Sequence, residues 1–196
     1  MQPFQKIQSF TPEISEASRK TIIQHFKSQK EKSTKTHFLH GRWENLYLNA
    51  HDVPEVRHCF NAAITLGKRM MNKSFIIPHQ GLGFSFDEYW FNEALPGEKT
   101  GWHNHKESAA LSGVYYLDVP EKSGNIQFRT KINEGWDTKT IQSKTGMMIL
   151  FDSTLDHSVE INNSLKPRLS LAFNLYTSPV NIQSETQNFS FNKFYS

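Results

Sequence analysis

The chain has 196 residues, with 22 basic and 19 acidic side chains and a formal net charge of +3. This length is typical of one domain with a substantial core, and so small an excess of positive charge does not indicate a nucleic-acid partner. Cys59 is the only cysteine, which excludes an internal disulfide, and no apolar run predicts a signal peptide or membrane span, so we expect a cytoplasmic protein.

The N-terminal part, residues 1–80, is predicted to form a helical support region for a single domain that spans the chain. Its first ten residues are expected to be a strand or an extended arm. Thr11 followed by Pro12 is typical of a helix start, because the hydroxyl can cap the helix and the ring already has a helical φ. Apolar residues then recur at helical spacing to about residue 29.

A second helix is predicted after a polar, Lys-rich loop at 28–37 and a strand within 41–50. Asp52 and Glu55 form a capping-box pattern, and Pro54 lies in the expected first turn. The residues that follow at helical spacing form one apolar stripe: Val56, Phe60, Ala63, Ile64, Gly67, Met70 and Met71. This stripe indicates a helix face that packs on a sheet rather than a cofactor site.

Short strands with glycine and proline between them are predicted from residue 82 to 177. Fifteen Phe, six Tyr and four Trp favour a β-rich core. The predicted strands lie at 84–94, within the stretch 102–117, and at 125–130, 146–151, 158–161 and 168–177, with a loop and a short strand at 131–143. Since no helix intervenes, the pattern predicts an α+β, mainly β fold with a jelly-roll core and helices packed on one sheet. Residues 178–196 are expected to be a C-terminal tail or lid.

Chemically active side chains gather in two of these stretches. Side chains on a strand alternate between faces, so His103, His105 and Glu107 are expected to share one face. A third histidine, His157, follows the apolar run at 146–151. Arg168 begins another apolar run, where its charge would be buried, so Arg168 predicts an acidic ligand or, alternatively, an ion pair with an acidic side chain.

The order of these elements resembles the iron(II)- and 2-oxoglutarate-dependent oxygenases. It is most similar to members with a His-x-His before a Ser-Gly-Val-Tyr-Tyr strand, here residues 112–116. The resemblance covers residues 82–177 and implies a double-stranded β-helix that binds Fe(II) and uses 2-oxoglutarate and O2. It implies a dioxygenase, most simply a hydroxylase acting on a C–H bond of a small molecule or peptide side chain, with release of succinate and carbon dioxide.

The resemblance leaves two sets of metal ligands open. In the first, which we favour, the ligands are His103, His105 and His157. In the second, His105, Glu107 and His157 form the common set of two histidines and a carboxylate, and His103 lies behind them. His105 is a ligand in both sets. Asp156 is expected either to orient an imidazole or to belong to a turn.

The resemblance also implies how 2-oxoglutarate would be held. Arg168 would pair with its distal carboxylate, Ser170 shares the face of Arg168, and Tyr116 matches the tyrosine that holds the same carboxylate. Asn92 is expected either to donate to a bound carboxylate or to bond to a neighbouring loop. Trp90, Trp102 and Trp136 are expected to wall the pocket.

Two other functions fit the same residues. A cupin-like metal dioxygenase with three histidines would not need 2-oxoglutarate, and so would not need Arg168. A non-catalytic jelly-roll module would hold a structural metal or none. The substrate stays open, and neither a nucleic acid nor a membrane is expected as a partner.

Overall fold

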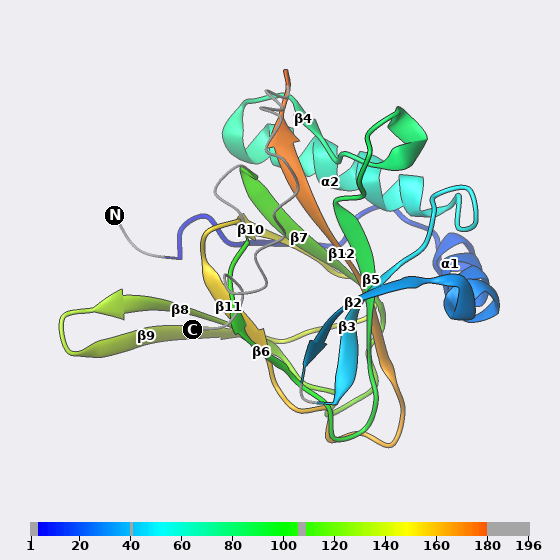
Figure 1. Cartoon of the computed structure of the whole chain (residues 1–196). Coiled ribbons are helices and arrows are strands. Elements are labelled where there is room, and N and C mark those ends of the chain that lie inside the picture. The colour runs from blue at the N-terminus through cyan, green and yellow to red at the C-terminus, as the bar shows by residue number, and fades with distance from the viewer. Residues whose placement is uncertain (1–3, 40, 106–108, 180–196) are drawn as a thin grey trace.

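The computed structural model describes residues 4–39, 41–105 and 109–179, which form two facing antiparallel sheets with helices on one side (Figure 1). The helices are α1 (Glu16–Gln29) and α2 (Val56–Met71), with short 3-10 turns η1 (Lys30–Lys32) and η2 (Gln80–Leu82). Among the described residues, neither helix has the length and apolarity to cross a membrane.

The larger sheet has eight strands in the order β1-β10-β7-β12-β5-β3-β2, with β4 beside β12. These strands are β1 (Gln8–Phe10), β2 (Thr34–Leu39), β3 (Arg42–Tyr47), β4 (Phe75–Ile76), β5 (Tyr89–Ala94), β7 (Leu111–Asp118), β10 (Met148–Asp152) and β12 (Arg168–Thr177). The smaller sheet has the order β6-β11-β8-β9. Its strands are β6 (Thr100–His103), β8 (Ile126–Ile132), β9 (Gly135–Ile141) and β11 (Asp156–Val159).

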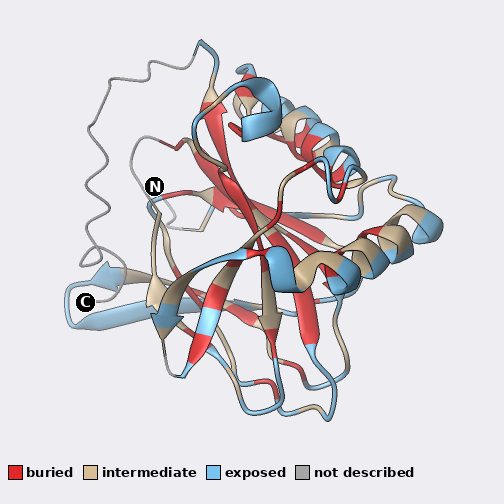
Figure 2. Ribbon diagram, turned by 45° about the vertical axis from the view of Figure 1, so that its right-hand side comes forward, coloured by how far each residue is buried: buried red, intermediate tan, exposed pale blue. Residues whose placement is uncertain are grey.

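Alternation along the central strand β12 separates two layers of core. Leu169, Leu171, Phe173 and Leu175 pack with α1 and α2 in one buried cluster (Figure 2). Arg168 and Ser170 therefore face the other way, toward the smaller sheet. A second buried cluster, which includes Tyr116, Phe128 and Phe151, fills part of the space between the sheets. The predicted jelly-roll fold with helices on one sheet is confirmed, and the inter-sheet space is where polar side chains can meet.

The two helices begin differently from the sequence prediction. Helix α1 starts at Glu16, because the Ser15 hydroxyl accepts a hydrogen bond from the Ser18 N–H at 3.1 Å, and not at Thr11 and Pro12. The capping box of α2 does not form. The Glu55 carboxylate instead accepts from His25 Nδ1 at 2.8 Å and so ties α2 to α1. The apolar stripe of α2 is buried as predicted, with Val56, Phe60, Ala63 and Gly67 in its core-facing side.

Three strand predictions were wrong in extent. Residues 34–39 form β2, an edge strand paired with β3, rather than a loop. Residues 131–143 form most of a long β8–β9 hairpin, whose second strand is almost wholly exposed and so lacks the apolar alternation that marks a strand. Strand β5 begins at Tyr89 rather than residue 84, because the Asp87 carboxylate accepts from the backbone N–H of Gln80 and holds this segment against η2. Residues 180–196 of the predicted tail lie outside the described residues.

Gly113 on β7 offers a test of the packing between the larger sheet and its core. A Cβ at this position would lie 2.3 Å from Phe173 Cε2 and 2.5 Å from Leu150 Cδ2. We expect Gly113→Ala to lower the free energy of unfolding by about 1–3 kcal/mol, as overpacking does. Gly67→Ala is the matched control, since its nearest contact would be 3.1 Å and alanine favours the helix. Urea denaturation measures both, and equal losses would contradict this packing.

Candidate metal centre

Three histidines from two strands of the smaller sheet converge in the space between the sheets. His103 ends β6 and pairs directly with His157 on β11, and His105 follows two residues later. One ligand nitrogen from each imidazole lies within 4.8 Å of the others. The ring centroids of His103 and His157 are 4.2 Å apart, and that of His105 is 5.3 Å and 5.0 Å from them. One ion could therefore contact all three rings.

Hydrogen bonds set which ring nitrogen carries the proton in two of these histidines. Nδ1 of His103 contacts the Gly101 carbonyl oxygen at 2.9 Å, and Nδ1 of His157 contacts the Leu155 carbonyl at 3.0 Å. Because a carbonyl oxygen only accepts, both Nδ1 atoms must donate, which leaves the lone pair of a neutral ring on Nε2. This is the tautomer that a metal ligand needs, held by backbone groups.

Burial keeps the three imidazoles neutral. It lowers the pKa of His103 below the ordinary value of histidine, and that of His105 and His157 well below it. For His157 the neighbouring His103 and His105 lower the pKa further. Neutral rings with lone pairs directed at one point bind a divalent cation better than a proton, so the donor set fits a metal ion such as iron.

The structure brings together the three histidines of the first ligand set. Among the described residues, no carboxylate belongs to a group of three or more candidate ligands with them. Glu107, the alternate ligand, lies outside the described residues, so the second set stays a prediction. The Asp156 carboxylate accepts from Asn104 Nδ2 at 2.9 Å and from Arg129 Nε at 3.1 Å, and its charge raises the pKa of His103 against the larger effect of burial.

Arg168 is buried with its charge uncompensated. Its side chain is 2% exposed, Nη1 donates to the Ser123 carbonyl at 3.1 Å, and Nε makes no hydrogen bond. Within the described part of the chain, no carboxylate forms an ion pair with it. Burial lowers the pKa of Arg168 to about 10, so it remains cationic at neutral pH. An isolated buried guanidinium is unfavourable unless an anion meets it.

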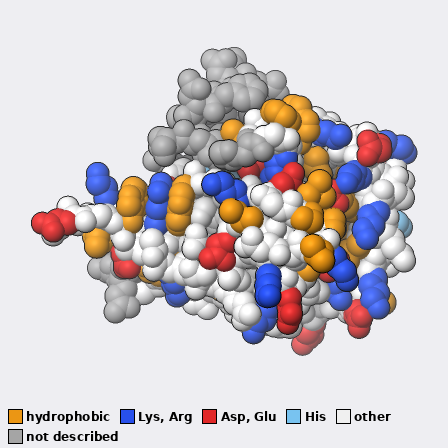
Figure 3. Space-filling view, turned by 90° about the horizontal axis from the view of Figure 1, so that it is seen from below, with side chains coloured by type: hydrophobic (Ala, Val, Ile, Leu, Met, Phe, Trp, Pro, Cys, Tyr) orange, Lys and Arg blue, Asp and Glu red, His pale blue; other side chains and the backbone are white. Residues whose placement is uncertain are grey.

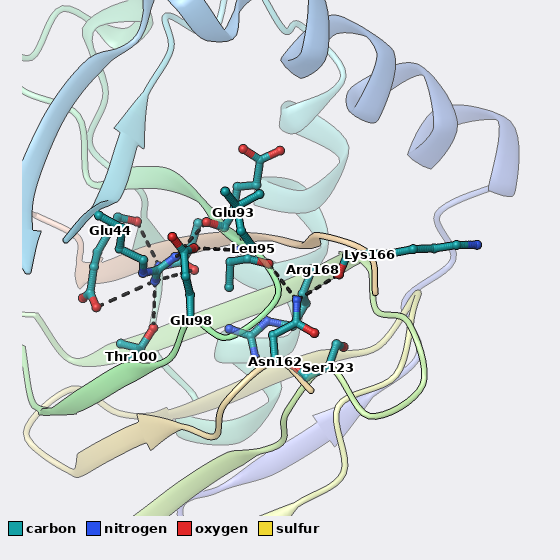
Figure 4. Close-up of polar contacts among 12 residues, drawn as sticks. Glu44, Glu93, Leu95, Glu98, Thr100, Ser123, Asn162, Lys166 and Arg168 are labelled. Carbon is teal, nitrogen blue, oxygen red and sulfur yellow. Dashed lines mark hydrogen bonds and ion pairs between the residues drawn. The ribbon is translucent and has the colours of Figure 1, made fainter. Parts of the chain in front are cut away.

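A second buried arginine, Arg42 on β3, shows how the same fold compensates such a charge. Arg42 lies 3.7 Å from the Glu44 carboxylate and 3.5 Å from that of Glu98, and it donates to Thr100 Oγ1 at 3.1 Å. In Figure 4, Glu44, Glu98 and Thr100 gather at one side, whereas Arg168 extends toward Ser123. In contrast to Arg42, Arg168 has no acidic partner among the described residues, as its predicted part in binding an anion requires.

The other residues predicted to hold the cosubstrate form a row across three strands. Ser170 on β12 is paired with Tyr116 on β7 and with Asn92 on β5. Arg168 lies two residues from Ser170 and therefore on the same face. The Tyr116 hydroxyl is buried and makes no hydrogen bond, and burial raises the pKa of Tyr116. An unpartnered hydroxyl and an unpartnered Nε on this face are donors that a carboxylate could satisfy.

The amide of Asn92 is already used within the protein. Its Nδ2 donates to the Glu44 carbonyl at 2.9 Å, and its oxygen accepts from Arg42 Nη2 at 3.2 Å. The geometry therefore agrees with the alternative in which Asn92 bonds to a neighbouring segment. Its contribution to carboxylate binding stays a prediction.

Of the three tryptophans predicted to wall the pocket, only Trp90 lies beside the histidines. Its ring centroid is 5.5 Å from that of His105, and Tyr47 on β3 lies 6.1 Å behind it. Trp102 and Trp136 instead stack on Arg129. Since His103 points between the sheets, its neighbour Trp102 must point to the outer face.

His37 is a residue near the metal centre that the sequence prediction missed. It lies close enough to His103 and His105 for its charge to lower their pKa values. Its Nδ1 contacts Asn45 Nδ2 at 3.0 Å, and its backbone has a φ of +59° on β2. No spacing motif could have found His37, because β2 reaches the site by pairing with β3 and was expected to be a loop.

A cleft of about 640 Å³ lies beside Ser123, whose carbonyl accepts a hydrogen bond from Arg168. It is lined by the turn after β7, the loop before β10 and the loop after β11, including Ser123, Ser143 and Glu160. None of the three histidines lines it. This cleft is therefore separate from the metal centre.

Comparisons with known proteins agree with the site. Residues 88–174, which contain all three histidines and Arg168, match the sequence model of a family described as "Putative 2OG-Fe(II) oxygenase". The segment that carries the histidines and Arg168 is therefore similar to the 2OG-Fe(II) oxygenases. Oxygenase chemistry with iron and 2-oxoglutarate is thus supported for the family as a whole, as the sequence resemblance implied. No curated protein sequence matches the chain.

Solved structures similar to this chain share its fold at low sequence identity. The alpha-ketoglutarate-dependent carbocyclase SnoK has a TM-score of 0.67 and 13% identity, over 88% of this chain and 79% of its own. The epimerase SnoN, in complex with Fe3+ and alpha ketoglutarate, has a TM-score of 0.65 and 12% identity, over 87% and 78%. A Pseudomonas putida prolyl-4-hydroxylase has a TM-score of 0.55 and 12% identity, over 87% and 84%.

Proposed function

We propose that this protein is an oxygenase that binds Fe(II) through His103, His105 and His157 and uses 2-oxoglutarate to hydroxylate a C–H bond of a small molecule or peptide side chain. O2 is consumed, and succinate and carbon dioxide are released. The single observation that carries the proposal is the buried Arg168, which has no acidic partner among the described residues and faces the same inter-sheet space as the histidines. Its charge calls for an anion, and the distal carboxylate of 2-oxoglutarate would supply one.

The side chains of this chain have separate parts in the proposed reaction. Three neutral imidazoles would occupy one side of the metal and leave its other positions open to ligands. Arg168 would hold the far carboxylate with help from the Tyr116 hydroxyl, so that the keto-acid end is turned toward the histidines. Iron and 2-oxoglutarate together supply the oxidising power for attack on a C–H bond.

Apolar side chains around the histidines keep bulk water out. Phe151 lies 4.7 Å and Phe128 6.2 Å from the ring of His157, and both are buried. Trp90 flanks His105 on the opposite sheet. A water-poor site favours reaction with a bound substrate over side reactions of the protein itself. We propose that the substrate binds against the side chains of Trp90, Tyr47 and His37, which lie near the histidines.

Hydroxylation is the simplest of the outcomes found among similar structures. These structures are of a prolyl-4-hydroxylase, a carbocyclase and an epimerase. Hydroxylation needs only that one C–H bond of the substrate be placed beside the metal, whereas ring closure or inversion needs a further positioned group. Mass spectrometry of the product distinguishes these reactions. A gain of one oxygen atom supports hydroxylation, whereas an unchanged mass or the loss of two hydrogen atoms rejects it.

The proposed use of 2-oxoglutarate is tested by anaerobic titration. Adding 2-oxoglutarate to the Fe(II)-loaded protein is expected to give a weak visible charge-transfer band, because the keto acid would chelate the metal. In air the same sample should form succinate. Bound iron that gives neither the band nor succinate contradicts the proposal, and a protein treated with a chelator is the control.

Three histidines without a described carboxylate also suit a cupin-like dioxygenase that does not use a keto acid. That alternative has no part for the uncompensated Arg168. It predicts O2 consumption without succinate, whereas a non-catalytic module predicts neither. We also propose a cytoplasmic location, where a reducing environment keeps iron ferrous and suits a chain whose one cysteine, Cys59, is a buried thiol.

A further inference from the structure

The strand that carries His103 is paired with its neighbouring strand at few positions. Strand β6 has four residues and lies at the edge of the smaller sheet. It pairs with β11 only at His103–His157 and Thr100–Val159, with a register shift between them. His105 lies beyond the strand, where one backbone hydrogen bond, from its N–H to the Ser153 carbonyl at 2.8 Å, holds it. Because metal ligands must be held within a few tenths of an ångström, such a short ladder needs support from side chains.

The outer face of this sheet provides that support through Asp156. One carboxylate oxygen accepts from Asn104 Nδ2 at 2.9 Å, and the other accepts from Arg129 Nε at 3.1 Å. Asn104 lies between His103 and His105 in the chain, and Asp156 immediately precedes His157. A single carboxylate therefore connects the two segments that carry all three histidines.

Arg129 is itself held between two aromatic rings. Its guanidinium carbon lies 4.5 Å from the ring centroid of Trp102 and 4.1 Å from that of Trp136. Trp102 precedes His103 on β6, and Trp136 comes from the β8–β9 hairpin, which projects from the body with basic and hydrophobic side chains alternating along it (Figure 3). Cation–π contacts on both faces restrict the guanidinium and orient it toward Asp156.

We propose that Asp156, Arg129 and Asn104 are positioning residues that hold the three histidines in the arrangement required to bind one metal ion, with Trp102 and Trp136 as the rings that fix Arg129. Three of these five residues are sequence neighbours of a histidine. The others belong to β8 and β9, so the projecting hairpin stabilises the metal centre through its outer face. This inference rests on the proposed metal site but does not depend on 2-oxoglutarate.

Asp156→Ala is expected to raise the dissociation constant for Co(II), a spectroscopic substitute for Fe(II), by about 10–100-fold, as the loss of residues that orient ligands does. The Co(II) visible spectrum should change in position or intensity, because the imidazoles no longer hold one geometry. Arg129→Ala and Trp136→Ala should shift both readouts in the same direction. Arg129→Lys should restore part of the affinity, since it keeps the charge but not the planar stacking.

Asp137→Ala is the matched control, because Asp137 is an exposed aspartate on the same hairpin. Thermal unfolding of each metal-free variant separates a loss of fold from a loss of ligand positioning. The inference is overturned if Asp156→Ala binds Co(II) with the affinity and the visible spectrum of the wild type. If Asp156→Ala does not fold, the Co(II) affinity and spectrum of Asn104→Ala test the inference instead. If the wild type binds no Co(II), the metal site and this inference both fail, whereas wild-type binding with unaffected variants rejects the inference alone.

Discussion

Replacing Arg168 with alanine is expected to weaken 2-oxoglutarate binding by roughly 30-fold to several thousand-fold while metal affinity is kept. Truncating one partner of a buried, hydrogen-bonded charge pair costs about 2–5 kcal/mol, and each 1.4 kcal/mol is about a factor of ten. Arg168 lies between the sheets, and the carboxylate would be its anionic partner. Anaerobic calorimetry with Mn(II)-loaded protein measures both affinities. Unchanged cosubstrate affinity would reject this part for Arg168.

Arg42→Ala is the informative comparison, because both arginines are buried but, in the described part of the chain, only Arg42 has acidic partners. Its loss leaves Glu44 and Glu98 without their cation, so we expect a lower free energy of unfolding. Arg168→Ala removes an uncompensated charge and should disturb the ligand-free fold less than Arg42→Ala does. Urea denaturation of the two variants in the absence of 2-oxoglutarate separates folding from ligand binding.

Removal of His105 is expected to have the largest effect on the metal. His105 is a ligand in both possible ligand sets, and its ring lies about 5 Å from those of His103 and His157. His105→Ala should raise the dissociation constant for Fe(II) by more than about 100-fold, beyond the effect of losing a residue that only orients a ligand. Metal content after gel filtration and Co(II) titration measure this loss. Retention of metal at wild-type affinity would exclude His105 as a ligand.

Two further variants make that experiment specific. His25→Ala is the control for loss of a histidine as such, since His25 bonds to Glu55 between the helices. Glu107→Ala distinguishes the two ligand sets. With His103, His105 and His157 as ligands, Glu107→Ala keeps its metal, whereas loss of metal would favour the set that includes the carboxylate.

The site could be anticipated from the sequence wherever a strand's period of two determined the outcome. His103 and His105 share a face because they are two residues apart, and the same rule places Ser170 with Arg168. The pairing of Ser170 with Tyr116 and Asn92 depends on the order and register of three strands, which the structure supplies. The burial of Arg168 was predicted from the apolar run around it.

The features of the site and the fold that the sequence did not predict depend on contacts between distant segments, which no local sequence pattern encodes. His37 reaches the metal centre only because β2 pairs with β3, and Asn92 is occupied because Arg42 comes from that same hairpin. The capping box of α2 fails because Glu55 meets His25, thirty residues earlier. Strand β9 is longer than the short strand predicted within 131–143, because an exposed edge strand has no buried face to impose alternation.

A crystal structure of the protein grown anaerobically with Mn(II) and 2-oxoglutarate tests the central claim most directly. We expect one ion bound by His103, His105 and His157, and the distal carboxylate of 2-oxoglutarate paired with the guanidinium of Arg168. An ion held by other side chains, or a keto acid that leaves Arg168 without an anionic partner, would contradict the account.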